Sequence, residues 1–453
     1  MSTTTIGHSR AAACGGSLVL SGLLVFSSGC GKSGGESTTP PLAPAQWQRR
    51  SENPLLIPPK NPPPATTFEA SIADPSVMYD ASDGKWKAWY SATIFDTAVA
   101  GDPGRMVIKY ADSSDGLHWT VQAAPVISAR GAATDWDYTQ VETPSVVRNP
   151  DPAAPAGKRF MLFYSGGNTV TDVAGGRPIR MNYPYYAIGL AWSADGRSFT
   201  RDLPGVDGKP GLALKASTVL ASVAGYYDGV VADPEAVVKD GQVLLWCSSY
   251  AEDAARGALA FGISHARSTT GTAWTFPAAN PLASIYKTGE LAGGEQPAVL
   301  YDADQGRFEM WYKNDTTAER LLIPTDWFTA YGFWHATSSD GIAWTPDYSK
   351  RDFAWEGAHD YETYGLLTGC SVVRRDGIDR MFYCAWGTHG IPDPLYYQLP
   401  LRTGSTVPAV ITFDQAFRQT PAAAPSPAVP ASVARRKAGA WPPLAALFGR
   451  GRR

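Results

Sequence analysis

The chain has 453 residues, with 39 Lys and Arg against 42 Asp and Glu, so its formal net charge at pH 7 is −3. Seven of the positive charges lie before residue 30 or after residue 420, which leaves an acidic body and argues against nucleic acid as the main partner. The aromatic residues (15 Trp, 21 Tyr and 16 Phe), together with 45 Gly and 36 Pro, favour many short strands joined by turns over long helices.

The first 29 residues predict a secretion signal. Arg10 precedes an apolar run at 17–26, which is too short to span a bilayer as a mature helix. Small residues at 27–29 stand directly before Cys30 and resemble the lipobox of bacterial lipoproteins, in which the cysteine becomes the lipidated N-terminus. Ordinary signal-peptide cleavage near the same place is the alternative. We expect export to a bacterial cell envelope, with membrane contact only through a lipid on Cys30.

Two low-complexity segments flank the predicted folded domain. Residues 30–46 are rich in Gly, Ser, Thr and Pro and predict a flexible tether, whereas residues 419–453 form a basic tail that we expect to be disordered. The apolar part of that tail is too short to span a membrane. This leaves residues 47–418 as the folded domain.

One pattern recurs five times within the folded domain. A strand-like run follows an anchor residue, then a turn, then an aromatic-rich strand; the anchors are Pro75, Pro144, Pro234, Pro297 and Ser371. Third strands are predicted in the first four copies at 108–120, 188–200, 262–275 and 333–345. Three of these contain Asp-Gly, a tight-turn signal. Short apolar runs at 124–128, 218–222 and 281–285 then predict fourth strands.

Five repeats of four antiparallel strands predict an all-β fold, a five-bladed β-propeller. The apolar segment 53–59 looks like a fourth strand but precedes the first anchor, so we expect it to complete the fifth blade and close the ring. In a propeller the first strand of each blade lines the central channel. The loops that enter these strands are long and aromatic here, which places the expected binding face on their side.

Four of the five copies place an acid just before the anchor: Asp74, Glu142, Asp233 and Glu295. Several carboxylates at one channel mouth repel one another and raise one another's pKa, so their convergence needs a reason. A single acid before a proline is more simply explained as a turn cap. Four acids in one orientation favour a functional site.

This constellation resembles the five-bladed glycoside hydrolases, above all family 43 with its relatives in families 32, 62, 68 and 130, over residues 50 to 415. The resemblance implies that Asp74 is the general base, that Asp233 tunes and orients the acid, and that Glu295 is the general acid. It implies a substrate-binding role for Glu142, which also matches the acid motif and is the alternative donor. A third carboxylate beside the acid would help it to keep its proton near neutral pH.

The resemblance also favours inversion of configuration. Ala73 stands where the retaining family 32 has Asn, and Gln296 stands where that family has Cys. Inverting enzymes separate the two carboxyl groups by about 6.5–9.5 Å, which leaves room for a water molecule. A separation near 5 Å would indicate retention instead.

Further residues are candidates for substrate binding. Glu235 follows Asp233 by two positions and shares its strand face, so it either lines the channel or pairs with an Arg. His389 follows the second strand of the fifth blade; the resemblance admits a calcium ion near it, although no oxygen-ligand cluster is visible in the sequence and a plain hydrogen-bonding role is the alternative. No other cofactor is expected. Aromatic loop residues that could stack on sugar rings, or simply brace their loops, are Trp136, Tyr138, Tyr226, Tyr227, Trp327 and Tyr364.

Other conspicuous residues are expected to be structural. Trp89, Trp246 and Trp311 fall inside second strands and predict core positions. Cys370 and Cys384 flank a hairpin, so they form either a disulfide or a pair of buried thiols, and no Cys/His spacing resembles a zinc site. The acids expected in turns on the opposite face are Asp83, Asp115, Asp195, Asp304 and Asp340.

The leading hypothesis is an exported, monomeric glycoside hydrolase that acts on an oligo- or polysaccharide. A family 130-like mannoside phosphorylase or hydrolase is the second hypothesis, although the channel-facing motifs supply few basic residues for phosphate. A non-catalytic carbohydrate-binding propeller is the third, because a fold alone does not establish activity.

Overall fold

The computed structural model of the chain describes residues 46–59, 66–96, 98–99, 104–132, 134–168, 185–202, 204–220, 230–253, 258–278, 280–285, 292–314, 331–390, 397–400 and 406–420. Within these ranges nearly all of the regular secondary structure is β-strand, from Gln48 to Gln419. No helix in the described part is long and apolar enough to cross a membrane.

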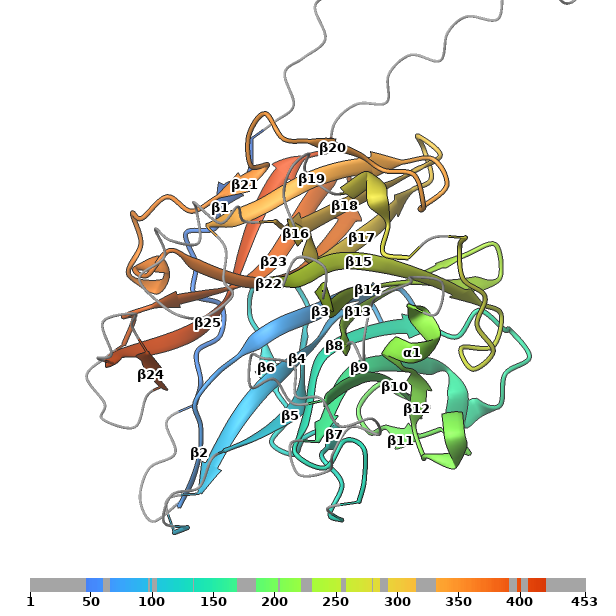
Figure 1. Cartoon of the computed structure of the whole chain (residues 1–453). Helices are drawn as coiled ribbons and strands as arrows, with labels where there is room; N and C mark the ends of the chain where they lie inside the picture. The colour runs from blue at the N-terminus through green and yellow to red at the C-terminus, as the bar shows by residue number, and fades with distance from the viewer. Residues whose placement is uncertain are drawn as a thin grey trace, which may run out of the picture. The chain divides into compact units, whose positions relative to one another are not determined.

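The strands form the blades of a five-bladed β-propeller, each starting from an inner strand (Figure 1). Blade 1 contains β3 (Ala73–Asp80), β4 (Lys85–Asp96), β5 (Arg105–Ser113), β6 (Thr120–Val121) and β7 (Ile127–Ser128), with β2 (Thr67–Glu69) beside β4. Blade 2 contains β8 (Gln140–Arg148), β9 (Phe160–Asn168), β10 (Tyr185–Ser193), β11 (Thr200–Arg201) and β12 (Leu212–Leu214). Blade 3 contains β13 (Val230–Lys239), β14 (Gln242–Asp253), β15 (Ala258–Ser268) and β16 (Ala292–Gly293).

Blade 4 contains β17 (Glu295–Asp302), β18 (Arg307–Lys313), β19 (Gly332–Ser338), β20 (Thr345–Asp347) and β21 (Phe353–Ala354). Blade 5 contains β22 (Leu366–Arg375), β23 (Ile378–Gly387), β24 (Tyr397–Pro400), β25 (Thr406–Gln419) and β1 (Gln48–Arg49). Helical structure in the described ranges is limited to single turns at α1 (Ala216–Val219), Ala156–Lys158, Val206–Gly208, Ala283–Ile285 and Asp360–Glu362.

The ring is closed by strands from both ends of the folded domain. The inner strands contact one another in the order β3, β8, β13, β17, β22, and β22 contacts β3 again. Strand β1 pairs antiparallel with β25, and Figure 1 shows blue β1 among the orange strands of blade 5. Leu56 adds a bridge to Phe413. The predicted closure is therefore confirmed, but its regular pairing begins at Gln48, upstream of the predicted segment 53–59.

Two of the predicted fourth strands are wrong. Segment 218–222 overlaps α1, and β12 pairs with β10 in its place. In segment 281–285 the Leu282 N–H donates to the Ile263 carbonyl of β15 at 2.8 Å, but the segment then turns at Ala283–Ile285; just before it, the side chain of Asn280 bonds the same strand. Its Oδ1 accepts the His265 N–H at 3.0 Å and its Nδ2 donates to the His265 carbonyl at 2.9 Å. The third prediction, 124–128, is confirmed by β7.

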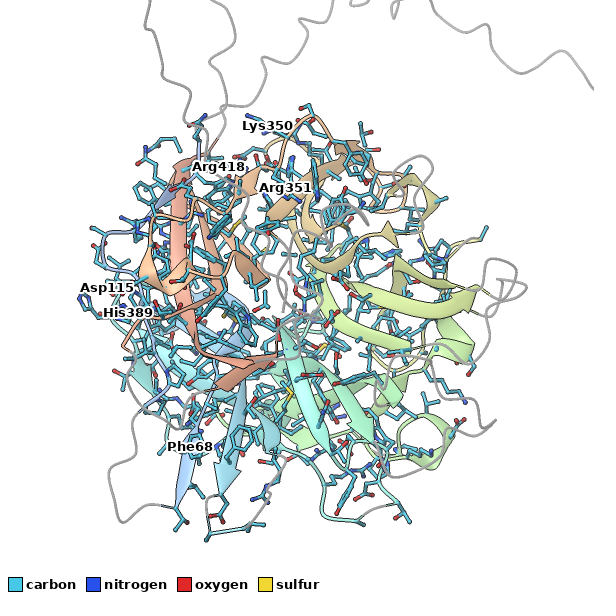
Figure 2. The ribbon with its side chains drawn as sticks, turned by 60° about the vertical axis from the view of Figure 1, so that its left-hand side comes forward. Phe68, Asp115, Lys350, Arg351, His389 and Arg418 are labelled. Carbon is cyan, nitrogen blue, oxygen red and sulfur yellow. The ribbon has the colours of Figure 1, made fainter. Side chains whose placement is uncertain are left out.

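The core lies between neighbouring blades, and the strand tryptophans are its anchors. Trp89 and Trp246 are fully buried, and each donates its indole N–H to a turn glycine of the next blade, Gly196 and Gly341. Trp311 is also buried and donates to Asp352. Arg418 of β25 pairs with the same Asp352 and so ties blade 5 to blade 4, at the end of the molecule where Figure 2 labels Arg351 and Lys350.

The predicted structural acids and the cysteines are also placed. The carboxylates of Asp115, Asp195 and Asp340 accept backbone N–H groups within their own turns, which confirms a structural role. Cys370 lies opposite Tyr383, and Cys384 lies opposite Thr368, so the two thiols do not face each other across the hairpin. Both are free and buried, and burial raises the pKa of each thiol.

Candidate active site

Each inner strand contains the same β-bulge at the same place. The ladder shifts register between Ala73 and Ser76 in blade 1, and at the equivalent positions in the other four blades. A residue with positive φ stands at each bulge: Asp74 (50°), Thr143 (46°), Asp233 (51°), Gln296 (49°) and Gly369 (40°). This conformation is unfavourable for most side chains, at about 1–3 kcal/mol each, and strain of this kind concentrates at functional sites.

The bulges are fixed by hydrogen bonds from the preceding blade. The N–H groups of Thr143, Asp233 and Gln296 donate to serine hydroxyls of the preceding second strand at 2.7–2.8 Å. The acceptors are Ser91, Ser165 and Ser248 respectively. In blade 1 the backbone of Asp74 makes the equivalent bond to the Cys384 thiol of blade 5. Each blade therefore sets the position of the next bulge.

The five bulges meet at one small cavity. Its lining residues come from all five inner strands: Asp74, Pro75, Thr143, Pro144, Asp233, Pro234, Glu235, Gln296, Pro297, Gly369 and Cys370. The water-accessible volume is about 30 Å³. A single water molecule needs about 10–15 Å³ measured in this way, so the cavity has room for one or two.

The four predicted acids occupy two different levels of this ring. Asp74 and Asp233 stand at the bulge positions themselves. Glu142 and Glu295 stand one position earlier, where Ala73 occupies the equivalent place in blade 1. The acids thus alternate between levels from blade 1 to blade 4, which limits their mutual repulsion while keeping them at one opening.

Asp74 is held in an environment that disfavours its charge. Burial raises the pKa of Asp74 to about 7, and the neighbouring charge of Asp233 adds to the effect. Lys313 and a hydrogen bond from Gln296 act in the opposite direction. The Gln296 Nε2 lies 3.4 Å from the Asp74 Oδ1. Near neutral pH Asp74 is therefore close to its midpoint of ionisation.

Burial also disfavours the charged form of Glu142. Burial raises the pKa of Glu142 to about 8, with further contributions from the charges of Asp74 and Asp233. The Tyr186 hydroxyl hydrogen-bonds the carboxyl group and opposes part of this rise. Glu142 is thus a neutral acid at pH 7, electrostatically coupled to both aspartates of the cavity.

Glu295 has a different environment from Glu142. Its side chain is 8% exposed, and its Oε1 lies 3.5 Å from the ammonium of Lys313, whose side chain is 3% exposed. The two residues are direct cross-strand partners on β17 and β18. The buried Lys313 ammonium therefore lies against the Glu295 carboxyl group, and the acid role that the sequence predicted for Glu295 stays a prediction.

Glu235 belongs to a second ring of hydrogen bonds that joins the blades. Its Oε1 accepts the Val299 N–H at 3.2 Å, and its Oε2 accepts the Ser145 hydroxyl at 3.0 Å. Ser76, Ser145 and Ser371 occupy the same position in their blades and each accepts an N–H from the next blade. Burial raises the pKa of Glu235 to about 8. Glu235 lines the cavity, as predicted, but its carboxyl oxygens are engaged in this ring.

The three predicted aromatic residues that the structure describes do not line the cavity. Trp136 is 2% exposed, donates its indole N–H to the Pro210 carbonyl and stacks on Tyr164, so the expectation that it stacks on a sugar is wrong: it braces its loop. Tyr364 packs against the core between blades 1 and 5. Tyr138 is half-buried and does not line the cavity. Four residues named in the sequence analysis lie outside the described ranges: Cys30, Tyr226, Tyr227 and Trp327.

His389 pairs with a carboxylate rather than facing the cavity. Its Nδ1 lies 2.9 Å from the Asp360 Oδ2, and the residue, labelled in Figure 2, stands just after β23 in the chain. Among the described residues, no group of three or more His, Cys, Asp or Glu side chains is arranged to hold a metal ion. The calcium expectation therefore has no supporting ligand set in this part of the chain.

Sequence reasoning missed Lys313, Gln296 and Gly369. The signal was present: the aromatic strands of blades 1 to 3 continue into Ser91, Ser165 and Ser248, whereas that of blade 4 ends in Lys313. Aligning the copies on their second strands instead of their prolines would have marked this lysine as an exception.

Comparison with known proteins gives the fold but no family. No family model matches the sequence, and no curated protein matches it. Among solved structures, an RGII complex of BT0996 shares the fold with a TM-score of 0.54 and 14% identity, covering 82% of the present sequence and 92% of its own. A structure described as a glycoside hydrolase has a TM-score of 0.53 and 13% identity, with the same coverage of both chains.

A third similar structure is named for a different reaction. It is an N-acetylgalactosamine deacetylase from F. plautii in complex with blood group B trisaccharide. Its TM-score is 0.51 at 15% identity, with 83% of the present sequence and 94% of the deacetylase covered. At such identities the likeness shows the shared propeller fold alone, and the reaction must be argued from the site.

Proposed function

We propose that the protein is a glycoside hydrolase whose reaction takes place at the bulge cavity. The observation that carries this proposal is the convergence of buried carboxyl groups from different blades at one opening, with Asp74 at one bulge and Glu142 one position before the next. The pKa of Asp74 is raised to about 7, and that of Glu142 to about 8. Glycosidic cleavage requires one carboxylic acid and one carboxylate on opposite sides of the scissile bond.

In this proposal Glu142 is the proton donor and Asp74 is the base. Glu142 gives its proton to the glycosidic oxygen as the bond from the anomeric carbon breaks. A water molecule attacks that carbon and gives a proton to Asp74, which yields the inverted sugar and a free hydroxyl group. Proton exchange with solvent then restores both groups. The cavity volume, sufficient for a water beside Asp74, supports direct attack by water.

This assignment moves the acid from Glu295 to Glu142. Glu295 is paired with Lys313, whereas Glu142 has a hydroxyl partner and a raised proton affinity. Asp233 contributes its charge to the raised pKa values of both Asp74 and Glu142, so in this proposal it tunes these two groups, whereas the sequence predicted that it tunes Glu295. Family 43 membership stays a prediction.

The phosphorylase alternative finds less support. Phosphorolysis requires cationic groups to bind phosphate, and no Lys or Arg lines the cavity among the described residues. Lys313 lies close by but is buried and paired with Glu295. We therefore infer that water, rather than phosphate, is the acceptor. Turnover that is independent of added phosphate would agree with this.

The test begins with a substrate screen against p-nitrophenyl glycosides, arabinans, xylans and fructans, with the product anomer read by NMR. Asp74→Asn should abolish turnover of every substrate found. Asp304→Asn, in an exposed turn on the opposite face, is the matched control and should leave turnover unchanged. Wild-type turnover in Asp74→Asn would refute the base assignment, and a folded protein with no glycosidase activity in the screen would favour the carbohydrate-binding alternative.

The two candidate acids are separated by leaving-group dependence. Without its proton donor, an enzyme loses most activity on substrates with poor leaving groups, because an activated aryl group departs without protonation. Glu142→Gln should therefore lose about 10²–10⁴-fold on natural glycosides but much less on dinitrophenyl glycosides. Glu295→Gln should lack this contrast. The reverse pattern would restore Glu295 as the donor.

We also propose that the protein is an exported, monomeric lipoprotein with a carbohydrate substrate. The support for export is the apolar run before Cys30, which lies outside the described residues. Cys30→Ser should release the protein from the membrane fraction of a bacterial host; retention there without the cysteine would contradict lipid anchoring.

A further inference from the structure

Lys313 breaks a structural rule that the other blades follow. Five residues occupy the equivalent position on the second strand, opposite the residue that precedes the bulge. They are Ser91, Ser165, Ser248, Lys313 and Cys384. The four small residues each accept the N–H of the next bulge residue. A lysine ammonium has no acceptor, so Lys313 cannot do this for Gly369.

Blade 4 compensates for this exchange with a second residue. The Gly369 N–H donates to the Oε1 of Gln296 at 2.9 Å, so the amide oxygen replaces the missing hydroxyl. The Nε2 of the same amide lies 3.4 Å from the Asp74 Oδ1. Gln296 therefore completes the ring of backbone contacts and orients Asp74 at once. The other blades do not need such an amide, because there a serine or cysteine accepts the N–H of the next bulge residue.

A buried lysine at this position, in place of a small residue, is unfavourable for stability unless its charge stabilises another group. Burying an ammonium group costs several kcal/mol before pairing, whereas a serine hydroxyl satisfies the fold without any such penalty. The Lys313 ammonium pairs with Glu295 at 3.5 Å and also acts on Asp74 and on the Cys370 thiol. It does not line the cavity, so it reaches a substrate only through its neighbours.

Asp74 is faced by charged and titratable groups from several elements. Asp233 on β13 raises its proton affinity, and the charges of Asp74 and Glu142 on β8 influence each other. The Cys384 thiol on β23 also lies within its field. Lys313 on β18 supplies the positive charge that opposes these effects. The charge balance at Asp74 thus depends on this ammonium.

We propose that Lys313 is a positioning residue of the hydrolytic site: its buried ammonium holds Glu295 in place and supplies positive charge near Asp74, the proposed base, while Gln296 fixes the direction of the Asp74 side chain. This inference rests on the proposed function only in naming Asp74 as the base. The contacts themselves are independent of any substrate.

The first test is the pH dependence of kcat/KM in Lys313→Met. Loss of a positive charge close to a carboxyl group shifts its midpoint by about 1 unit or more, so the acidic limb should move to higher pH. The matched control is Lys87→Met, which removes another buried lysine, 2.6 Å from the Asp80 Oδ2, on blade 1. That variant should lose stability and leave the limb where it is. An unmoved limb in Lys313→Met would overturn the proposal.

The second test needs no substrate. In protein labelled with ¹³C at the aspartate carboxyl groups, the Asp74 signal is the one missing from Asp74→Asn. Its titration midpoint should rise in Lys313→Met and stay unchanged in Lys87→Met. If Lys313→Met does not fold, Lys313→Ser introduces the residue found in blades 1 to 3 and should fold, with the same rise in the Asp74 titration midpoint. A shift without glycosidase activity would uphold the positioning role and refute the proposed function; a folded variant with no shift would refute the positioning role.

Discussion

Gly369 and Asp74 compete for the same space at the cavity. A Cβ atom on Gly369 would lie 2.7 Å from the Asp74 Cα and 2.7 Å from its Oδ1, closer than real Cβ contacts come. The φ of Gly369 is 40°, in the region that favours glycine. Blade 5 therefore has a glycine at its bulge, which leaves space for the Asp74 carboxyl group of blade 1.

Gly369→Ala should therefore reduce activity by displacing Asp74. The conflict involves the Asp74 backbone, so it cannot be relieved by rotating a side chain, and a shift near 1 Å lowers catalytic rates by about 10²-fold. Gly377→Ala is the control: its φ of 70° carries the same backbone penalty, but nothing lies within 4 Å of the added Cβ. The measurement is kcat/KM on the best glycoside. Equal activities in the two variants would show that Asp74 tolerates the displacement.

Glu235→Gln should stabilise the protein increasingly as pH rises. Because burial raises the pKa of Glu235 to about 8 in the folded state, the carboxyl group ionises first in the unfolded chain. The wild type then loses stability between the ordinary glutamate value, about 4.3, and about 8. Glutamine has no such loss. Urea unfolding at pH 5 and pH 8 should show that the difference in unfolding free energy between variant and wild type is larger at pH 8. A difference that does not change with pH would mean that Glu235 does not titrate in this window.

The pH profile of kcat/KM should be bell-shaped and narrow. Asp74 must be ionised, so activity rises with pH through about 7, and Glu142 must be protonated, so activity falls through about 8. The two groups are coupled, so the limbs report the pair rather than either residue alone. Glu142→Gln should remove the alkaline limb on activated substrates. An optimum near pH 5 would contradict both assignments.

The sequence predicted the ring and its acids because both are properties of a repeat. Asp74 and Asp233 are recognisable from their place before a proline, and the bulge carries each of them to the same cavity. The proposed choice of Glu142 rather than Glu295 as the acid does not follow from the repeat. It depends on Lys313, which is the direct partner of Glu295 on the neighbouring strand, and on the Tyr186 hydroxyl beside Glu142. Neither contact follows from spacing along the chain.

The burial of loop residues also could not be predicted from the sequence. Trp136 stands in a segment of the predicted binding face, but the absence of a side chain at Gly166 lets its ring pack against β9: a Cβ there would lie 2.4 Å from the indole. At 281–285 the side-chain amide of Asn280 bonds the backbone of β15 just before the turn Ala283–Ile285, where the sequence predicted a fourth strand. Both depend on pairings between residues of different elements.

Trp47→Ala should weaken closure of the ring. Trp47 is 7% exposed, lies edge-on to Trp311 and Phe353, and donates its indole N–H to Asp352 at 2.8 Å. It stands directly before β1, whose pairing with β25 joins the two ends of the domain. Removing a buried tryptophan side chain costs about 3–5 kcal/mol of unfolding free energy.

The control for this variant is Ile57→Ala in the same N-terminal segment, where the side chain is 39% exposed. Chemical denaturation should show a much smaller loss for Ile57→Ala than for Trp47→Ala. Limited proteolysis should also cleave Trp47→Ala faster near residues 46–59, because the freed segment leaves the edge of β25 unpaired. Equal stabilities would show that the last blade holds its place without its N-terminal strand.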